Sequence, residues 1–190
     1  MARPAEKIKE LYTYKDYLEW GEDERCELID GEIYAFSCPL PIHCDIHREL
    51  VLIIGNHLKG KSCTMYFSPY DVRLNSDSAD DTVVQPDILV ICDKSKQDKR
   101  SYKGAPDLAI EITSPSNAYV DRYIKYHKYL KAGVKEYWIV EPQDRIVNVF
   151  VLENGQYNHT PYKENEIVKS TILIDCVIDL KEVFPPEEGI

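Results

Sequence analysis

Two short apolar stretches stand out along the chain because each of them contains one carboxylate. Residues 85–91 read Gln-Pro-Asp-Ile-Leu-Val-Ile, and residues 108–113 read Leu-Ala-Ile-Glu-Ile-Thr. Short apolar runs of this kind are typical of buried strands. A buried carboxylate is costly unless it is paired, hydrogen-bonded or bound to a cation. The pattern therefore predicts two buried strands that bring Asp87 and Glu111 to a divalent-metal site.

The remaining pattern predicts further elements around this pair. Thr13 and Asp16 favour a helix that begins there and ends near Gly21, and Asp30-Gly31 between two apolar runs predicts a β-hairpin over residues 26–36. Apolar residues recur at helical spacing from 42 to 58, and a second helix is expected from Ser116 or Asn117 to Lys131. Other expected strands cover residues 63–67, 70–74, 136–140, 146–152 and 171–174, with a charged loop at 93–104.

This order of elements favours an α/β domain with a mixed sheet, in the α+β sense, over repeated βαβ units. With 190 residues and no linker-like stretch, we expect residues 1–190 to form a single domain. The 44% hydrophobic and 29% charged residues are typical of a globular protein. No run approaches the roughly 18 apolar residues of a membrane span, and the N-terminus lacks an apolar signal region, so a cytoplasmic protein without a membrane partner is expected.

Six cysteines are scattered along the chain without any C-x-x-C pair, and we expect reduced thiols rather than disulfides or zinc ligands. His43 and His47 lie four residues apart, but the H-E-x-x-H spacing of a zinc site is absent. The net charge of −10 argues against a general nucleic-acid coat and does not exclude a nuclease. The basic residues between Lys94 and Lys103 suit either a DNA-backbone contact beside the active site or a solvated loop.

Alternation along a strand places Asp87, Leu89 and Ile91 on one face, and Ala109, Glu111 and Thr113 on one face of the other strand. If the strands are neighbours in register, both carboxylates project into one pocket. Such hard oxygen ligands suit Mg²⁺ or Mn²⁺. The alternative is a buried pair satisfied by backbone N–H groups or by Arg73.

Four stretches in order carry a resemblance to a known family. They are Glu-Leu-Ile-Asp-Gly-Glu at 27–32, Val-Gln-Pro-Asp-Ile at 84–88, Ala-Pro-Asp-Leu-Ala-Ile-Glu-Ile-Thr-Ser-Pro-Ser at 105–116 and Ala-Gly-Val-Lys-Glu-Tyr-Trp at 132–138. Together they resemble the Uma-type putative restriction endonuclease family of the PD-(D/E)XK nuclease superfamily, over roughly residues 12 to 184. The resemblance implies a restriction-endonuclease-like core with an N-terminal helix and β-hairpin. It also implies a Mg²⁺- or Mn²⁺-dependent endonuclease that acts on DNA.

The resemblance also assigns residues. Asp87 matches the Asp of the "PD" motif and Glu111 the second acidic residue, both as metal ligands. Thr113 stands where the superfamily places its lysine, so Lys125, four residues after Asp121, is implied as the catalytic lysine, which would orient or help deprotonate the attacking water and stabilise phosphate charge.

Three further residues are additional candidates. Asp121 is one of them. Glu27 is either a ligand at the pocket edge or a solvent-facing hairpin residue, and His43 is either a phosphate contact or a packed helix-terminal residue.

A rival hypothesis is a nuclease-fold module, catalytically weak or inactive, that binds nucleic acid or a protein partner. The acidic charge and the missing strand lysine favour it. Because nucleases of this class often act as dimers, we also expect a homodimer, for which the many tyrosines could supply an interface.

Overall fold

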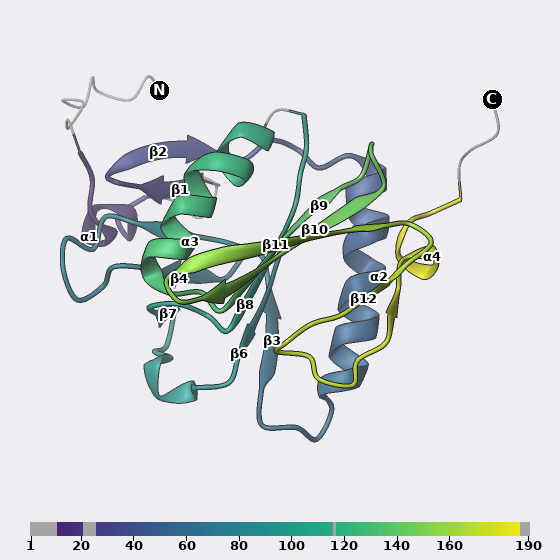
Figure 1. Ribbon diagram of the computed structural model, residues 1–190. Coiled ribbons are helices and arrows are strands. Elements are labelled where there is room, and N and C mark those ends of the chain that lie inside the picture. The colour runs from purple at the N-terminus through teal and green to yellow at the C-terminus, as the bar shows by residue number, and fades with distance from the viewer. Residues whose placement is uncertain (1–10, 21–25, 116, 187–190) are drawn as a thin grey trace.

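The computed structural model describes residues 11–20, 26–115 and 117–186 (Figure 1). Its larger sheet lies between the long helix α2 (Pro41–Leu58) and the helix α3 (Tyr126–Ala132). The mixed α/β fold predicted from the sequence is confirmed. Within the described residues, no helix combines the length and the apolar character needed to cross a bilayer.

The larger sheet has the strand order β11-β10-β9-β8-β6-β3, and only β8 and β9 run parallel. Its strands are β3 (Thr64–Phe67), β6 (Ile88–Ile91), β8 (Leu108–Ile112), β9 (Glu136–Glu141), β10 (Ile146–Glu153) and β11 (Gln156–Lys163). The antiparallel register pairs Ile88 with Ile110. Asp87 and Glu111, one residue further along, therefore lie at the same end of the β6–β8 pair.

The smaller sheet has the order β2-β1-β5-β4-β7. Its strands are β1 (Cys26–Ile29), β2 (Glu32–Ala35), β4 (Asp71–Arg73), β5 (Val83–Val84) and β7 (Ser101–Lys103). The predicted hairpin is confirmed: Asp30 and Gly31 both have positive φ angles, 52° and 79°, as a two-residue turn of this type requires.

The central strands β6 and β8 are buried on both faces, as their apolar runs predicted. On one face, Ile46 and Leu50 of α2 pack in a cluster with Ile88 and Ile110. On the other, Tyr129 of α3 packs in a cluster with Leu89, Ala109 and Tyr137.

The shorter helical elements are α1 (Tyr14–Tyr17), α4 (Leu180–Val183), a 3₁₀ turn η1 (Lys94–Lys96) and a π-helix η2 (Val120–Lys125) that leads directly into α3. A helix begins after Thr13, as predicted, and the Asp16 carboxylate accepts hydrogen bonds from the N–H and the hydroxyl of Thr13. The helix ends earlier than expected, and Gly21 lies outside the described residues. The predicted cap residue Ser116 also lies outside them.

The C-terminal part of the sequence prediction is wrong. Residues 171–174 do not form a strand, because Thr171 instead hydrogen-bonds to the buried Glu136 carboxylate and Leu173 fills the core from a turn. The two-stranded sheet here joins β12 (Ile167–Val168) and β13 (Ile178–Asp179). The region 93–104, expected as a loop, contains η1 and β7.

The expectation of reduced cysteines is wrong for one pair. The β3–β6 register places Thr64 opposite Ile91, so Cys63 and Cys92 form the next pair, with Cα atoms 4.0 Å apart and a disulfide between them. This proximity depends on strand pairing across 29 residues, which cysteine spacing alone does not reveal.

Candidate active site

Asp87 is held by two elements where β6 begins. One of its carboxylate oxygens, Oδ2, accepts a hydrogen bond from the backbone N–H of Ile112 at 2.7 Å and lies 3.2 Å from His43 Nε2. The Nε2 atom of His47 lies 3.1 Å from the Asp87 carbonyl oxygen. The first turns of α2 therefore fix the Asp87 backbone and side chain against the end of β8.

The surroundings of His43 favour the protonated, cationic form of its imidazole ring. Burial alone would lower the pKa of its imidazole, but the hydrogen bond and the charge of Asp87, with the charge of Asp121, outweigh it and raise the pKa above its ordinary value. The His43 ring is thus a charge partner of Asp87 rather than a helix cap. His43 and His47 both face Asp87.

Glu111 is a buried carboxylate in the middle of the site. Its Oε1 atom accepts hydrogen bonds from Lys125 Nζ at 3.0 Å and from the Tyr129 hydroxyl at 2.7 Å. Burial raises the pKa of Glu111 well above its ordinary value. The Lys125 charge opposes this shift, while the charges of Asp121 and Asp87 add to it.

Lys125 lies at the centre of three carboxylates, and only 3% of the residue is exposed. Its Nζ atom lies 2.9 Å from Glu27 Oε2, 3.0 Å from Glu111 Oε1 and 3.3 Å from Asp121 Oδ1. Burial alone would lower the pKa of the ammonium group, but the charges of these carboxylates outweigh it and raise the pKa well above its ordinary value. Lys125 is therefore protonated throughout the neutral pH range.

The π-helix η2 carries both Asp121 and Lys125 into the site. Both residues lie on η2, four positions apart, and both are buried. Side chains four positions apart share a face of a helix, and π-helical turns occur often at functional sites. Burial raises the pKa of Asp121 to about 6, although the charge of Lys125 opposes the shift.

Glu27 of β1 belongs to the same cluster, and only 3% of it is exposed. Its Oε1 atom accepts a hydrogen bond from the backbone N–H of Gln85 at 2.7 Å, and its Oε2 atom pairs with Lys125. The interpretation of Glu27 as a solvent-facing hairpin residue is therefore wrong. Glu27 connects the smaller sheet to the segment that leads into Asp87.

Five of the six candidate residues line one cavity of about 90 Å³, which we call the carboxylate cavity. They are His43, Asp87, Glu111, Asp121 and Lys125. Glu27 joins this group through Lys125. The structure thus brings together all six residues that the sequence singled out.

The sequence prediction missed Tyr129, which hydrogen-bonds to Glu111. Its position one helical turn after Lys125, on the same face, was the available signal. Tyr129 is fully buried, and burial together with the Glu111 charge raises the pKa of its phenol well above the ordinary value. Its hydroxyl is therefore a hydrogen-bond donor to Glu111.

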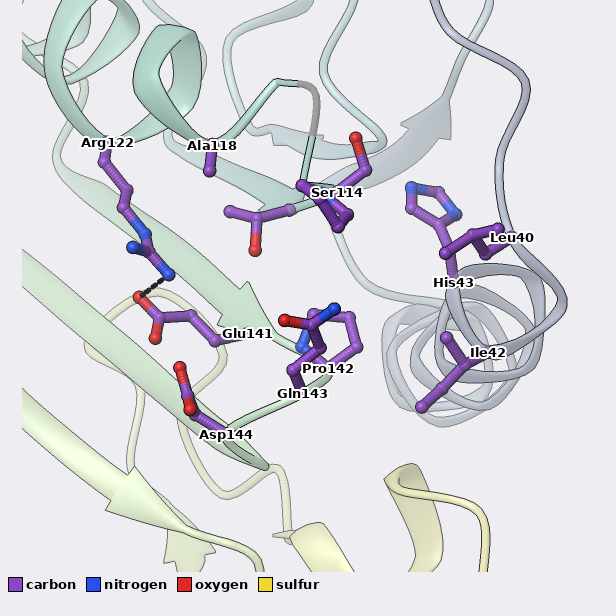
Figure 2. Close-up of a pocket in the computed structure, with 12 residues that line it drawn as sticks. Leu40, Ile42, His43, Ser114, Ala118, Arg122, Glu141, Pro142, Gln143 and Asp144 are labelled. Carbon is purple, nitrogen blue, oxygen red and sulfur yellow. Dashed lines mark ion pairs between the residues drawn. The ribbon is translucent and has the colours of Figure 1, made fainter. Parts of the chain in front are cut away.

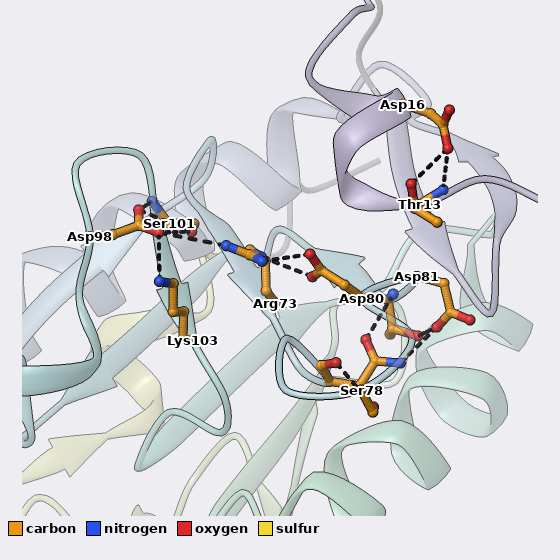
Figure 3. A network of polar contacts seen from close by, with 11 residues as sticks. Thr13, Asp16, Arg73, Ser78, Asp80, Asp81, Asp98, Ser101 and Lys103 are labelled. Atoms are coloured by element: carbon orange, nitrogen blue, oxygen red, sulfur yellow. Dashed lines mark hydrogen bonds and ion pairs between the residues drawn. The ribbon is translucent and has the colours of Figure 1, made fainter.

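Side-chain contacts show what Arg73 and Thr113 do in the structure. Arg73 does not satisfy Asp87 or Glu111, because its guanidinium pairs with Asp80 and Asp98 (Figure 3). Thr113, at the position of the superfamily lysine, donates its hydroxyl to the Val140 carbonyl oxygen at 3.2 Å. This threonine therefore strengthens the β8–β9 pairing.

The basic residues between Lys94 and Lys103 do not adjoin this cavity. The segment that carries them leaves β6 after Ile91, whereas Asp87 precedes Ile88 at the other end of the strand. The expectation of a DNA-backbone contact beside the active site is therefore not supported for this strip.

The chemistry of the cavity fits a divalent cation. Three buried carboxylates, those of Glu27, Glu111 and Asp121, surround one ammonium group, which leaves an excess of buried negative charge, and the Asp87 carboxylate lines the same cavity. Protons or a cation must offset such an excess. Among the described residues, no group of three or more His, Cys, Asp or Glu side chains is arranged to enclose a metal ion. Mg²⁺ does not need one, because it is usually bound through one or two carboxylates and keeps several waters.

Comparison with known proteins identifies the family and agrees with the fold. The Uma2 family, described as "Putative restriction endonuclease", matches residues 14–180, and the chain belongs to this family. The resemblance inferred from the sequence motifs is thereby confirmed.

Similar proteins include one relative in sequence and one in solved structure. The uncharacterized protein slr1290 of Synechocystis sp. is 30% identical over 117 residues, a match that covers 60% of this chain and 60% of that protein. A crystal structure of a putative nuclease belonging to DUF820 from Anabaena variabilis has a TM-score of 0.74 and 21% identity, and the match covers 91% of this chain and 97% of that one. The structural likeness establishes the restriction-endonuclease-like fold.

Proposed function

We propose that this protein is a divalent-metal-dependent endonuclease that hydrolyses DNA phosphodiester bonds, with Asp87 and Glu111 as the ligands of Mg²⁺ or Mn²⁺. The observation that carries the proposal is the buried group of three carboxylates around Lys125, one of them Glu111, beside a cavity that Asp87 also lines. Membership of the Uma2 family supports the same reaction class. A bound divalent ion supplies charge stabilisation for the phosphodiester and lowers the pKa of a bound water.

In this proposal, the protein groups around the cavity orient the carboxylates of Asp87 and Glu111 and partly neutralise their charge. The Ile112 N–H and His43 hold one oxygen of Asp87, and Tyr129 and Lys125 hold one oxygen of Glu111. Each carboxylate therefore has a fixed orientation and a second oxygen for a ligand. Such fixed geometry is what an electrostatic catalytic site requires.

Lys125 acts as a cation, not as a base. Because its pKa is raised, the ammonium group is protonated and can only donate hydrogen bonds. It stabilises negative charge that develops on the phosphate and orients the attacking water. The proposed part in deprotonating the water belongs instead to Asp121, which lines the cavity and has a pKa of about 6, near the working pH of a general base.

A cleavage assay with plasmid DNA tests the proposal. With Mg²⁺ or Mn²⁺ present, wild-type protein should convert supercoiled DNA to nicked or linear forms. Asp87→Asn and Glu111→Gln should each reduce the rate at least about 100-fold. Asp45→Asn, a change of the same kind at an α2 carboxylate that pairs with the exposed Arg48, should leave the rate unchanged.

Two results would overturn the proposal. One is cleavage by pure Asp87→Asn protein at the wild-type rate, which would indicate a contaminating nuclease or a different site. The other is an absence of wild-type cleavage with either metal on double-stranded and single-stranded DNA.

A second candidate is a nuclease-fold module that binds nucleic acid or a protein without turnover. The close engagement of Lys125 by three carboxylates favours it, because a lysine so neutralised is less available to a phosphate. Titration calorimetry separates the two candidates. Failure to bind Mn²⁺ at millimolar concentration, together with retained DNA or protein binding, would favour the module.

A homodimer is part of the leading proposal, since cutting both strands of a duplex needs two active sites. Tyr119 and Tyr123 stack on each other with exposed fractions of 67% and 55%, which makes them candidates for an interface. Analytical ultracentrifugation of wild-type protein and of the Tyr119→Ser/Tyr123→Ser variant tests this part separately.

A further inference from the structure

Gln85 is not one of the six candidate residues, yet it lines the carboxylate cavity. It follows β5 directly and is half-buried. Its backbone N–H donates to Glu27 Oε1 at 2.7 Å. On the side chain, the amide nitrogen Nε2 lies 2.8 Å from Asp71 Oδ1 and 3.0 Å from the Tyr17 hydroxyl. Gln85 is therefore held at both its backbone and its side chain.

The contact with Asp71 decides which end of the Gln85 amide is free. A carboxylate accepts hydrogen bonds, so the amide nitrogen and not the amide oxygen faces it. The Tyr17 hydroxyl donates to the same Asp71 oxygen at 3.1 Å, and burial raises the pKa of this phenol above its ordinary value, which keeps it a donor. Among the described residues, no hydrogen bond reaches the amide oxygen Oε1. Because the two ends of a planar amide point in different directions, Gln85 offers the cavity an uncharged acceptor.

Most carboxylate oxygens around the cavity are already engaged. Both oxygens of Glu27 have partners, one a backbone N–H and the other an ammonium group. Asp87 and Glu111 each have one engaged oxygen and, in the proposed function, offer the other to the metal. The Asp121 carboxylate remains, as the general base. A second acceptor is needed to fix both O–H bonds of a water, and Gln85 provides it.

Two other groups near this cavity are less suited to holding a water. The side-chain amide of Asn117 also lines the cavity, but within the described part of the chain no hydrogen bond fixes its orientation. The Glu141 carboxylate lies in a second cavity, of about 270 Å³, beside the first. Figure 2 shows Glu141 paired with Arg122, and its Oε1 atom lies 3.1 Å from Arg122 Nη2. Gln85 therefore supplies the anchored amide of the carboxylate cavity.

We propose that Gln85 orients the water that attacks the phosphodiester, by accepting one hydrogen bond from this water through Oε1 while Asp121 accepts the other. The inference rests on the proposed nuclease function. With both O–H bonds fixed, a lone pair of the water points to the phosphorus atom. The water oxygen then bonds to phosphorus, Asp121 takes one proton, and the bond to the leaving sugar oxygen breaks as that oxygen takes a proton from solvent. Glutamine orients the attacking water in some enzymes of phosphoryl transfer.

An uncharged acceptor suits this cavity better than another carboxylate would. Three carboxylates already share the charge of Lys125. A further negative charge in the cavity would oppose the approach of a phosphodiester. The charge that orients the amide is that of Asp71, which lines none of the cavity.

Single-turnover cleavage of a short DNA duplex with Mg²⁺ tests the role of Gln85. Gln85→Met has a similar shape without the acceptor and should lower the cleavage rate constant at least about 30-fold, because a misplaced reacting group costs on the order of 100-fold. Its DNA dissociation constant in a metal chelator should stay within about twofold of wild type, because the amide contacts the water and not the DNA. Gln97→Met is the matched control. The Gln97 amide contacts two tyrosine hydroxyls, each at 2.9 Å, and lines none of the carboxylate cavity, so this variant should cleave at the wild-type rate.

Two more variants separate an acceptor for water from a purely structural contact with Asp71. Gln85→Lys keeps a donor for the Asp71 carboxylate and loses the acceptor, so it should remain folded and be as slow as Gln85→Met. Asp71→Asn/Gln85→Glu exchanges the amide and the carboxylate, keeps the total charge and leaves a carboxylate oxygen for the water. This double variant should cleave more slowly than wild type but at least about tenfold faster than Gln85→Met, a coupling within the usual range for contacting residues.

Four results would overturn the proposal for Gln85: a Gln85→Met rate within about threefold of wild type, an equally slow Gln97→Met, a Gln85→Lys rate equal to wild type, or a double variant no faster than Gln85→Met. Any of these, together with metal-dependent cleavage by wild-type protein, leaves the proposed nuclease function standing. An absence of cleavage by wild-type protein overturns both proposals.

Discussion

Replacing Lys125 by methionine removes one buried cation from three carboxylates. At separations of 2.9, 3.0 and 3.3 Å, each attraction is roughly 5 kcal/mol at an effective dielectric constant of about 20, and the desolvation of lysine offsets much of the sum. Removing one partner of a buried ion pair costs about 3–5 kcal/mol in the free energy of unfolding. We expect a loss of this size for Lys125→Met near pH 8.

The loss of unfolding free energy caused by Lys125→Met should be smaller at lower pH. The pKa values of Glu111 and Asp121 are already raised in the folded protein, and loss of the Lys125 charge raises them further. A carboxyl group with a folded pKa above its unfolded value stabilises the fold as pH falls through the folded value. The variant should therefore recover stability, relative to wild type, as pH falls from about 8 to about 5.

Urea unfolding in a metal chelator, followed by circular dichroism, measures both effects. Lys128→Met is the matched control on α3, because Lys128 pairs with one mostly exposed carboxylate, that of Asp30, and should cost less than about 1 kcal/mol. A loss below about 1 kcal/mol for Lys125→Met near pH 8, or a larger loss that does not change with pH, would refute the reasoning about the charged cluster.

Other predictions concern pH, the disulfide and one turn. The cleavage rate should rise as pH increases through about 6, where Asp121 loses its proton. Asp121→Asn should lack this rise in the pH–rate profile. An identical rise in the variant would contradict the role of Asp121. Reduction of the Cys63–Cys92 disulfide should lower the free energy of unfolding by about 2–4 kcal/mol, and equal urea midpoints with and without reductant would contradict it. Gly31→Ala should lower the free energy of unfolding by about 1–3 kcal/mol, because the φ angle of Gly31 is +79° and the new Cβ would lie 2.8 Å from Leu11 Cβ. Gly155→Ala, at the same φ but in open space, should cost less in the same unfolding assay.

The positions of Asp87 and Glu111 could be predicted from the sequence because they depend on simple strand geometry. Alternation fixes the face of a strand, and two apolar runs of matching length favour pairing. The family resemblance then indicated Lys125. Hydrophobic pattern alone could not, because it assigns a charged helix residue to the solvated face, whereas Lys125 is buried by carboxylates from distant strands.

Other features depended on contacts between distant segments. All four residues of β1 are buried, so Glu27 does not follow the alternation expected of a hairpin with one solvated face. Cys63 and Cys92 meet only through the β3–β6 register. Residues 171–174 have the composition of a strand, yet Thr171 bonds to Glu136 and the segment turns. In each case tertiary contacts overrode the local pattern.

A crystal of the protein soaked in Mn²⁺ shows directly whether Asp87 and Glu111 bind a metal, because manganese is located by its anomalous scattering. We expect one manganese peak in the carboxylate cavity, with Asp87 and Glu111 as its protein ligands. An identical soak of Glu111→Gln crystals should show no peak there. Manganese bound elsewhere on the chain, or no bound manganese at millimolar concentration, would contradict the claim that these two carboxylates form a metal site.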